Sequence, residues 1–198
     1  MVRPTAAEPL RSSISKTKPV KVSCDDRGVA LLLVCGIPAS GKTTFTRWLE
    51  REHSWLRVDT DSVYANPRLD PDLHRLLTTV PLDVDGLVEH LGRQSDNVAV
   101  EWGFQPLAYM ASIELLRAMG VNMWWFDGDR DAARNAYSRR EGGAVSAMQA
   151  HDVQMARIIR MWPRITAAFD GHVITTVRPG PNHVRPTEVY ELIAPSLS

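Results

Sequence analysis

VALLLVCGIPASGKTTFTRWL, residues 29–49, is the most informative stretch of the chain. Its first seven residues, Val29–Cys35, are apolar and rich in leucine and β-branched side chains, which is typical of a central parallel strand buried on both faces. Aromatic and aliphatic residues then recur at helical spacing through Leu49, so we expect a helix there. Between the two lies GIPASGKT, Gly36–Thr43, which matches the pattern G-x-x-x-x-G-K-[ST] in full. The motif therefore has the strand–loop–helix setting that it requires.

Each part of this motif has a reason in phosphate chemistry. Gly36 and Gly41 allow backbone angles and a close approach that a Cβ would obstruct. The loop amides then point inward around phosphate oxygens, at the positive end of the following helix. Lys42 can reach the β- and γ-phosphates, and the hydroxyl of Thr43 is placed to bind Mg²⁺. We expect a nucleoside triphosphate to bind the loop formed by Gly36, Ile37, Pro38, Ala39, Ser40, Gly41, Lys42, Thr43 and Thr44.

Strand-like and helix-like segments alternate along the rest of the chain. The further strands are predicted at Trp55–Asp61, Asn97–Gly103, Val121–Asp129 and His172–Val177. The further helices are predicted within residues 81–94 and at Pro106–Gly120, Asp131–Arg140, Ala147–Phe169 and Pro186–Ala194. The helix at Ala147–Phe169 would bury one face, made of Met155, Ile158, Ile159, Trp162, Ile165 and Phe169. This alternation predicts an α/β fold with one five-stranded parallel sheet and helices on both faces.

The composition restricts the class of protein. The chain has 198 residues, 44% of them hydrophobic and 23% charged, which suits one ordinary globular domain. A formal net charge of zero gives no general electrostatic case for nucleic acid or an anionic membrane as partner. No apolar run approaches the roughly 18 residues of a membrane span. Two cysteines, Cys24 and Cys35, are too few for a disulfide framework, so we expect a cytoplasmic protein.

Residues 1–27 differ from the remainder. Six Lys and Arg stand against three acids there, a net charge of +3, among many Ser, Thr and Pro residues. The segment shows no apolar periodicity, so we predict a flexible N-terminal tail at residues 1–27 and a P-loop domain at residues 28–198. A solvated tail and a basic arm for an anionic partner both fit, and the solvated tail is favoured.

GIPASGKTT, followed by RVDTDSVY at Arg57–Tyr64, resembles the small P-loop kinases. That group contains the shikimate, gluconate and adenylate kinases, polynucleotide 5′-kinases, and zeta-toxin-like and antibiotic phosphotransferases, and the loop is also similar to AAA-type ATP-binding domains. The resemblance spans residues 29–177. It implies a P-loop NTPase fold with a lid, ATP and Mg²⁺ as cofactors, and a hydroxyl as phosphoryl acceptor. The N-K-x-D motif of GTPases and the L-S-G-G-Q motif of transporter ATPases are absent from the sequence.

Asp59 and Asp61 stand two residues apart at the carboxyl end of the predicted second strand. Residues i and i+2 of a strand face the same way, and ligands collect outside the carboxyl ends of parallel strands. The resemblance implies that Asp61 is the base and that Asp59 is an outer-shell ligand of Mg²⁺. The alternative is that both acids cap the next helix. Similar kinases often carry an arginine three residues after the base, where this chain has Tyr64, which weakens the case for a phosphorylated or polynucleotide acceptor.

Glu101 ends the predicted third strand, where a Walker-B acid would stand. It would bind Mg²⁺ directly or through water, so the predicted metal site consists of Thr43, Asp59 and Glu101. A local salt bridge or a hydrogen bond to substrate is the alternative. Trp102 and Phe104 follow, and they would line the acceptor pocket or belong to the core.

Several arginines are candidates for the lid. The resemblance implies that Arg134 packs on the adenine and that Arg139 or Arg140 closes over the phosphates, while a solvated helix face accounts for any one of them equally well. Arg178, after the fifth strand, would flank the base. The predicted catalytic set is Lys42, Asp61, Arg139 and Arg140.

The sequence thus predicts an ATP- and Mg²⁺-dependent kinase that phosphorylates a hydroxyl of a small molecule. The acceptor would lie under the connection at residues 68–94. One alternative is a polynucleotide 5′-hydroxyl kinase, although nucleic acid is an improbable partner because the chain carries no basic stripe. Another is a non-catalytic regulatory module that responds to ATP.

Overall fold

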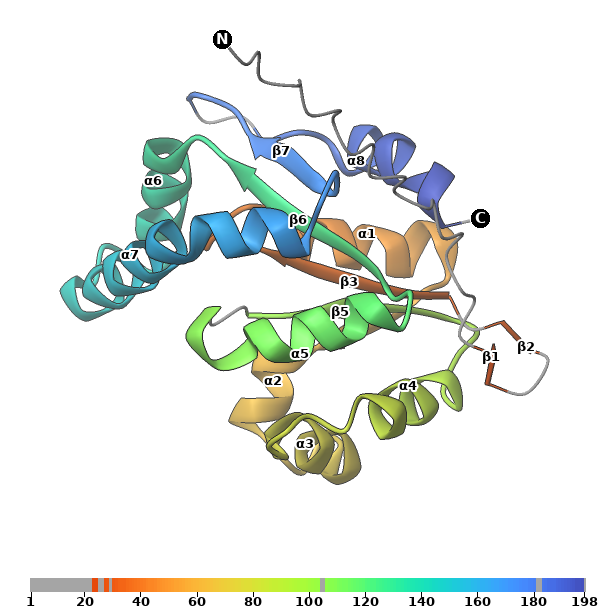
Figure 1. Cartoon of the computed structure of the whole chain (residues 1–198). Helices are drawn as coiled ribbons and strands as arrows, with labels where there is room; N and C mark the ends of the chain where they lie inside the picture. Colours follow the sequence, from red (N-terminus) through yellow and green to blue (C-terminus); the bar gives the residue numbers. More distant parts are fainter. Residues whose placement is uncertain (1–22, 25–26, 29, 104–105, 181–182, 198) are drawn as a thin grey trace, which may run out of the picture.

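A computed structural model describes residues 23–24, 27–28, 30–103, 106–180 and 183–197. Its centre is a sheet of five parallel strands in the order β4-β5-β3-β6-β7 (Figure 1). The strands are β3 at Ala30–Gly36, β4 at Leu56–Asp59, β5 at Asn97–Glu101, β6 at Asn122–Gly128 and β7 at Val173–Val177. The predicted α/β fold with a five-stranded parallel sheet is confirmed.

Helices cover both faces of this sheet (Figure 1). They are α1 at Lys42–His53, α2 at Thr60–Ala65, α3 at Pro71–Thr78, α4 at Val84–Gly92, α5 at Pro106–Ala118, α6 at Arg130–Arg140, α7 at Val145–Ala168 and α8 at Pro186–Ile193, followed by the 3₁₀ turn η1 at Ala194–Ser196. Helices α1 and α8 lie against one face, and α3, α4, α5 and α7 contribute to the core on the other.

The central strand β3 belongs to both cores. Leu32 and Val34 pack with α1 and α8, whereas Leu33 and Cys35 pack with the helices of the opposite face. Successive side chains of a strand alternate between the two faces of a sheet, so a strand buried on both must be apolar throughout. This is why the run ahead of the glycine loop carries no polar residue.

The connection between α2 and β5 contains two helices where one is predicted. The unpredicted helix is α3. Its N-cap is Asp70, whose side chain accepts a hydrogen bond from the Leu73 amide at 2.8 Å. Pro71 occupies its first turn, where the missing amide hydrogen does no harm. Helix α4 starts in the same way, with Asp83 accepting from the Gly86 amide at 2.9 Å. An Asp–Pro pair ahead of apolar residues was the signal for α3.

Helix α7 begins at Val145, two residues earlier than predicted. The turn before it contains Gly142 and Gly143 at φ 62° and 71°, a left-handed conformation that favours glycine. Ile159 was predicted on its buried face and is 61% exposed, so that assignment is wrong, whereas Ile158 beside it is fully buried. Not every apolar residue of this periodic helix is therefore buried.

Part of the predicted N-terminal tail is described. Ser23–Cys24 (β1) and Arg27–Gly28 (β2) pair as two short antiparallel strands, and the rest of the tail lies outside the described residues. Among the residues that are described, no helix combines the length and the hydrophobicity that crossing a membrane requires.

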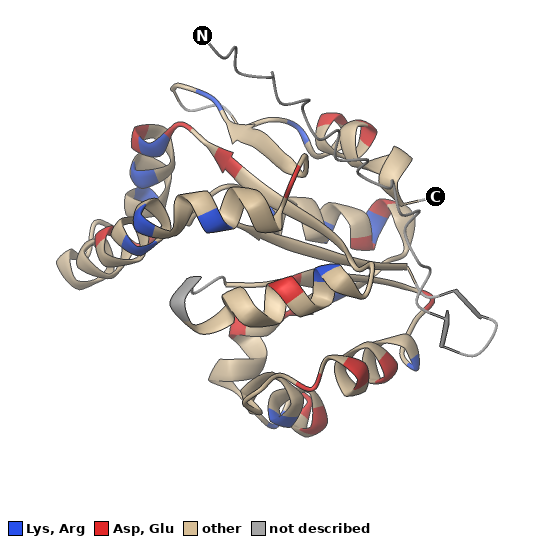
Figure 2. Ribbon diagram, in the orientation of Figure 1, with Lys and Arg blue, Asp and Glu red and all other residues tan. Residues whose placement is uncertain are grey.

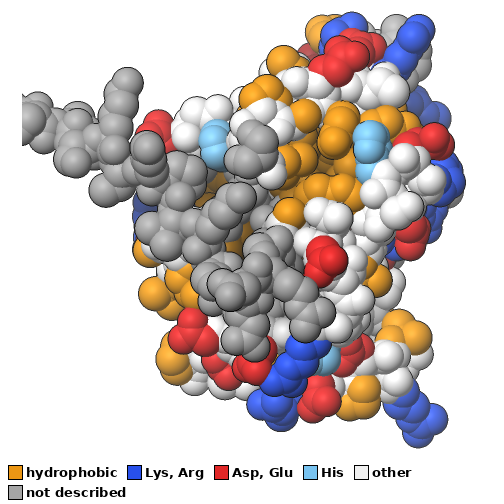
Figure 3. Space-filling model, turned by 90° about the vertical axis from the view of Figure 1, so that its right-hand side faces the viewer, with side chains coloured by type: hydrophobic (Ala, Val, Ile, Leu, Met, Phe, Trp, Pro, Cys, Tyr) orange, Lys and Arg blue, Asp and Glu red, His pale blue; other side chains and the backbone are white. Residues whose placement is uncertain are grey.

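The surface is chemically mixed. Lys and Arg gather along α6, whereas Asp and Glu are more frequent on α3 and α4 (Figure 2). On the side where α8 and the C-terminus lie, hydrophobic side chains reach the surface beside histidines (Figure 3). Where α1 meets α8, the rings of Trp48, His53 and Tyr190 contact one another.

Candidate active site

The glycine loop connects the carboxyl end of β3 to the first turn of α1. Gly36 has φ 149°, and a Cβ there would lie 2.3 Å from the backbone oxygen of Phe126 on β6, so only glycine fits. Gly41 is the N-cap of α1 in the left-handed conformation, with φ 87°. The sequence analysis explains Gly36 by the close approach of phosphate. The structure gives a second reason, because the neighbouring strand β6 leaves no space for a side chain at this position.

Two further contacts fix the outer side of this loop. The Thr176 hydroxyl on β7 donates to the Ser40 carbonyl at 2.8 Å, and this contact is buried. The ring Nε2 of His183 lies 2.9 Å from the Ala39 carbonyl. Ala39 itself has φ 58°, an unusual angle for a residue with a Cβ. Bonds from β7 and the segment after it therefore hold the loop in a shape that its own sequence does not favour.

The ammonium group of Lys42 folds back over the loop. Its Nζ donates to the Ile37 carbonyl at 2.9 Å and to the Gly36 carbonyl at 3.3 Å. Burial lowers the pKa of Lys42, and the carboxylate of Glu101 opposes that effect, followed by the weaker influence of Asp61. Lys42 therefore lies in the field of both carboxylates that are predicted to act with it.

Glu101 reaches the loop because β5 is the neighbour of β3. Val34 and Glu101 are partners in the register of these two parallel strands. The Thr43 hydroxyl donates to Glu101 Oε1, and the Thr46 hydroxyl donates to Oε2 at 3.2 Å. A P-loop hydroxyl joined to a carboxylate at a strand end is the pair that holds Mg²⁺ in P-loop NTPases.

Asp59 and Asp61 come together differently from the prediction. Strand β4 ends at Asp59 and α2 begins at Thr60, so the two acids do not share one strand face, and that part of the prediction is wrong. Asp59 Oδ1 accepts from the backbone amides of Asp61 and Ser62 at 3.1 and 3.3 Å. Asp59 is thus the N-cap of α2, as the capping alternative has it.

Asp61 lies in the first turn of α2, and its carboxylate lies against Gly103, just after β5. A Cβ built on Gly103 would be 2.2 Å from Asp61 Oδ1. Burial raises the pKa of Asp61, the charge of Asp59 raises it further, and Lys42 opposes both. The two acids therefore reach one region because the ends of β4 and β5 adjoin.

Arg57 is the functional candidate that the sequence analysis missed. One guanidinium nitrogen, Nη2, donates to Asp59 Oδ2 at 2.9 Å and to Glu101 Oε2 at 2.8 Å. Its Nε donates to the Thr46 hydroxyl at 3.1 Å. Arg57 stands two residues before Asp59 on β4, and Asp59 and Glu101 are partners in the register of β4 and β5. The sequence RVD contains the signal, because residues i and i+2 of a strand face the same way and Arg57 would therefore lie beside Asp59.

Comparison with protein-family models and with curated protein sequences finds no match. Solved structures do match. A gluconokinase from Sinorhizobium meliloti 1021 has 12% identity and a TM-score of 0.50, over 85% of this chain and 91% of that one. A shikimate kinase from Bacteroides thetaiotaomicron has 14% identity and a TM-score of 0.54, over 83% of this chain and 98% of that one. The chain has the fold of the small P-loop kinases. At this identity the likeness shows the fold alone.

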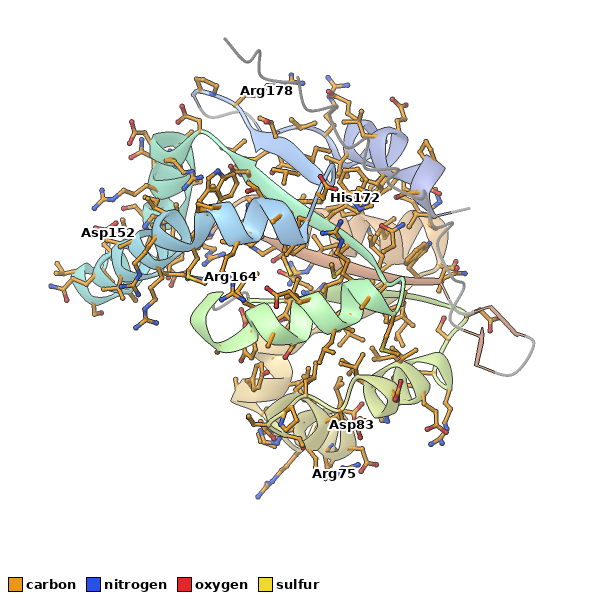
Figure 4. The ribbon with its side chains drawn as sticks, in the orientation of Figure 1. Arg75, Asp83, Asp152, Arg164, His172 and Arg178 are labelled. Carbon is orange, nitrogen blue, oxygen red and sulfur yellow. The ribbon has the colours of Figure 1, made fainter. Side chains whose placement is uncertain are left out.

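The two arginines that are predicted to contact the adenine each form an ion pair with an acidic side chain. Arg134 on α6 forms two parallel hydrogen bonds of 3.0 Å with Asp152 on α7. Arg178, which follows β7, pairs with Glu188 at 3.3 Å. Figure 4 labels Asp152 and Arg178. All four side chains are solvent-exposed.

The two candidate lid arginines differ in their surroundings. Arg140 pairs with Glu141 at 2.8 Å, and its guanidinium carbon lies 4.8 Å from the Tyr137 ring centroid. Its positive charge also acts on Lys42 and Asp61, after burial and the nearer charges. Arg139 is exposed. The charge of Arg140 thus reaches Lys42 and Asp61 weakly, and its direct contacts are with Glu141 and Tyr137.

The aromatic pair after β5 is only partly described. Trp102 is completely buried and contacts the ring of Tyr109, so it belongs to the core. Phe104 lies outside the described residues.

The residues present suit Mg²⁺ that arrives with a nucleotide. No group of three His, Cys, Asp or Glu side chains that could hold a metal ion occurs in the described part of the chain. Mg²⁺ is usually bound through one or two carboxylates together with phosphate oxygens and water. The joined Thr43 and Glu101 supply a hydroxyl and a carboxylate, which is the protein's share of such a site.

Proposed function

We propose that the protein is an ATP- and Mg²⁺-dependent phosphotransferase that moves the γ-phosphoryl group to a hydroxyl of a small molecule. One observation carries the proposal: Lys42, the hydrogen-bonded Thr43 and Glu101, and the Asp61 carboxylate meet where β3, β4 and β5 end. A fold of the P-loop kinase type with these groups at its strand ends can bind a triphosphate and accept a proton beside it.

The proposed roles follow from the contacts. Lys42 would exchange its loop carbonyls for the β- and γ-phosphates, which are stronger acceptors because they are charged. Thr43 and Glu101 would hold Mg²⁺, with Asp59 in the outer shell, and the ion would neutralise charge on the phosphates. Asp61 would accept the proton of the attacking hydroxyl, and its raised pKa makes it a better proton acceptor than an ordinary aspartate.

The arginines would complete the site when the lid closes. Arg140, with Arg139 as the second candidate, would approach the γ-phosphate from the turn at Gly142 and Gly143. Arg134 and Arg178 would flank the adenine after leaving their acidic partners. Exposed ion pairs of this kind contribute little to stability, so a nucleotide can displace them.

The acceptor would lie near Asp61, beneath α3 and α4. Tyr64 stands three residues after Asp61, and its hydroxyl donates to the Leu77 carbonyl on α3 at 3.1 Å. A neutral side chain at this position favours a small molecule over a polynucleotide. A cytoplasmic location belongs to the same proposal, and burial raises the pKa of the Cys35 thiol, which keeps it unreactive.

The test is ³¹P NMR of the full chain with Mg·ATP and pooled alcohols, sugars and nucleosides. A new phosphomonoester signal that disappears in Lys42→Ala and in Asp61→Ala is the expected result. Calorimetry should show that Asp61→Ala still binds Mg·ATP. Release of inorganic phosphate alone, across acceptor pools that cover these classes, would contradict transfer and favour a nucleotide-dependent regulatory module, in which Asp61 is dispensable.

A further inference from the structure

Arg57 occupies an unusual position in the candidate active site. A single nitrogen, Nη2, lies 2.9 Å from Asp59 Oδ2 and 2.8 Å from Glu101 Oε2. The two carboxylate oxygens therefore bind the same nitrogen atom, and the guanidinium of Arg57 occupies the position between them. The Arg57 side chain is only 14% exposed, so water screens this charge weakly.

Other donors hold the second oxygen of each acid. Glu101 Oε1 accepts from the Thr43 hydroxyl, and Asp59 Oδ1 accepts from two amides of α2. Because Arg57 takes Oε2, the carboxylate of Glu101 is turned so that Oε1 faces the glycine loop. Arg57 thus forms ion pairs with both acids that are predicted to bind the metal, and it donates hydrogen bonds to Asp59, Glu101 and Thr46.

Positive side chains offset the charge of the acid pair. Asp59 and Glu101 carry two negative charges, Arg57 cancels one of them, and Lys42 lies in the field of Glu101 as a second positive charge. Asp61 is a third carboxylate of this region, and Lys42 lies in its field as well. A divalent cation gains little from a pair of acids that is already neutralised in this way. Phosphate oxygens of a nucleotide would restore the negative charge that the cation requires.

We propose that Arg57 acts as a built-in cation, which positions Glu101 for Thr43 and makes divalent metal binding depend on a bound nucleotide. The role assigned to the nucleotide rests on the proposed function. The role of Arg57 in excluding metal from the acid pair does not. The metal would accordingly enter this site together with the triphosphate and would not precede it.

The first measurement uses Mn²⁺ as a paramagnetic probe of the full chain without nucleotide. The wild-type protein should bind Mn²⁺ weakly, with no stoichiometric site. Arg57→Gln removes the charge and keeps a side-chain amide, so it should bind Mn²⁺ at least tenfold more tightly. Arg57→Lys keeps the charge and should behave like the wild type. Arg47→Gln, which removes an exposed arginine on α1, is the matched control and should change nothing.

Calorimetry of ATP binding, with and without Mg²⁺, supplies the second readout. The ratio of the two affinities should be large in the wild type and at least tenfold smaller in Arg57→Gln. An Arg57 with a purely structural role would lower thermal stability and leave this ratio unchanged, which would overturn the proposal. Tight Mn²⁺ binding by the nucleotide-free wild type would also overturn it, even if Arg57→Gln failed to fold.

The two proposals can fail separately. If the wild type does not bind Mg·ATP, the proposed function fails, yet tighter Mn²⁺ binding by nucleotide-free Arg57→Gln would still establish Arg57 as the cation of the acid pair. If Mg·ATP binds and Arg57→Gln shows no change in Mn²⁺ affinity, Arg57 is an ordinary ion-pair residue and only the further inference fails.

Discussion

Replacing Gly103 with alanine tests Asp61 without removing its carboxylate. A Cβ at Gly103 would lie 2.2 Å from Asp61 Oδ1 and 2.7 Å from Cγ and Oδ2. The backbone of Gly103 is outside the left-handed region, so the substitution adds no backbone strain. Ordinary contacts of a Cβ begin near 3.4 Å. The carboxylate must therefore retreat by about 1 Å, a displacement of the size that disturbs catalytic geometry.

The expected effect on catalysis is large and specific. A misplacement of about 1 Å can lower a rate about 10²-fold, which corresponds to about 2.7 kcal/mol of transition-state stabilisation. We expect kcat for transfer to the acceptor to fall by this factor in Gly103→Ala. The Kd for Mg·ATP should stay the same, because the residues assigned to phosphate and metal do not include Asp61. Coupled kinetics and calorimetry measure the two quantities separately.

A double-mutant cycle with Asp61→Ala decides the cause. Asp61→Ala removes the three atoms nearest to the new methyl group, so Gly103→Ala should have little further effect in that background. An equal loss in both backgrounds would show that the methyl group acts on another part of the site. A wild-type rate for Gly103→Ala would refute the assignment of Asp61 as the base in its present position.

Three further predictions follow from individual contacts. Gly36→Ala should destabilise the fold by about 1–3 kcal/mol and abolish Mg·ATP binding, because its Cβ would meet the Phe126 carbonyl at 2.3 Å; unchanged urea unfolding would contradict this. Hydrogen bonds from Arg134 lower the pKa of Asp152 to about 2, below its usual 3.8. The stability that this pair adds should be complete above pH 3.8 and lost as the pH falls through about 2, and Asp152→Asn should remove this pair's part of the pH dependence seen in thermal melts. Burial raises the pKa of Cys35, so peptide mapping after alkylation should find it modified only on unfolding, and rapid labelling of the native protein would argue against this packing.

The fold could be predicted because its signals are local. The strand ahead of the loop is apolar at every position, and the loop motif fixes what precedes and follows it. Each predicted strand needed only its own residues to be recognised. Helix α3 was overlooked although Asp70 and Pro71 mark its start, since only three of its eight residues are buried. Its three leucines have helical spacing, but a helix of eight residues spans only about two turns, so the spacing repeats too few times to be decisive.

The acids were predicted at one site for a partly incorrect reason. The i, i+2 argument required both to lie on one strand, but the side chain of Asp59 competes for the backbone amides that follow and starts α2. Asp61 reaches Gly103 nevertheless, because β4 and β5 are neighbours and both end at the same edge. The position of Asp61 beside Gly103 therefore depends on the strand order, which the sequence does not reveal.

The charge balance of the site depends on contacts that no local pattern encodes. Arg57, Asp59 and Glu101 form one cluster only because β5 lies between β3 and β4, with Asp59 opposite Glu101 in the register. Among these residues and Lys42, positive and negative charges cancel, and Asp61 adds a further negative charge, so the net charge of the cluster would not attract a triphosphate. On the proposed function, the backbone amides of the loop and of the first turn of α1 would supply the binding, as they do at helix N-termini in general. On the proposed function, the loop shape that the sequence predicts would determine the affinity for nucleotide, and the ionic cluster that it does not predict would determine which metal–nucleotide form the loop accepts.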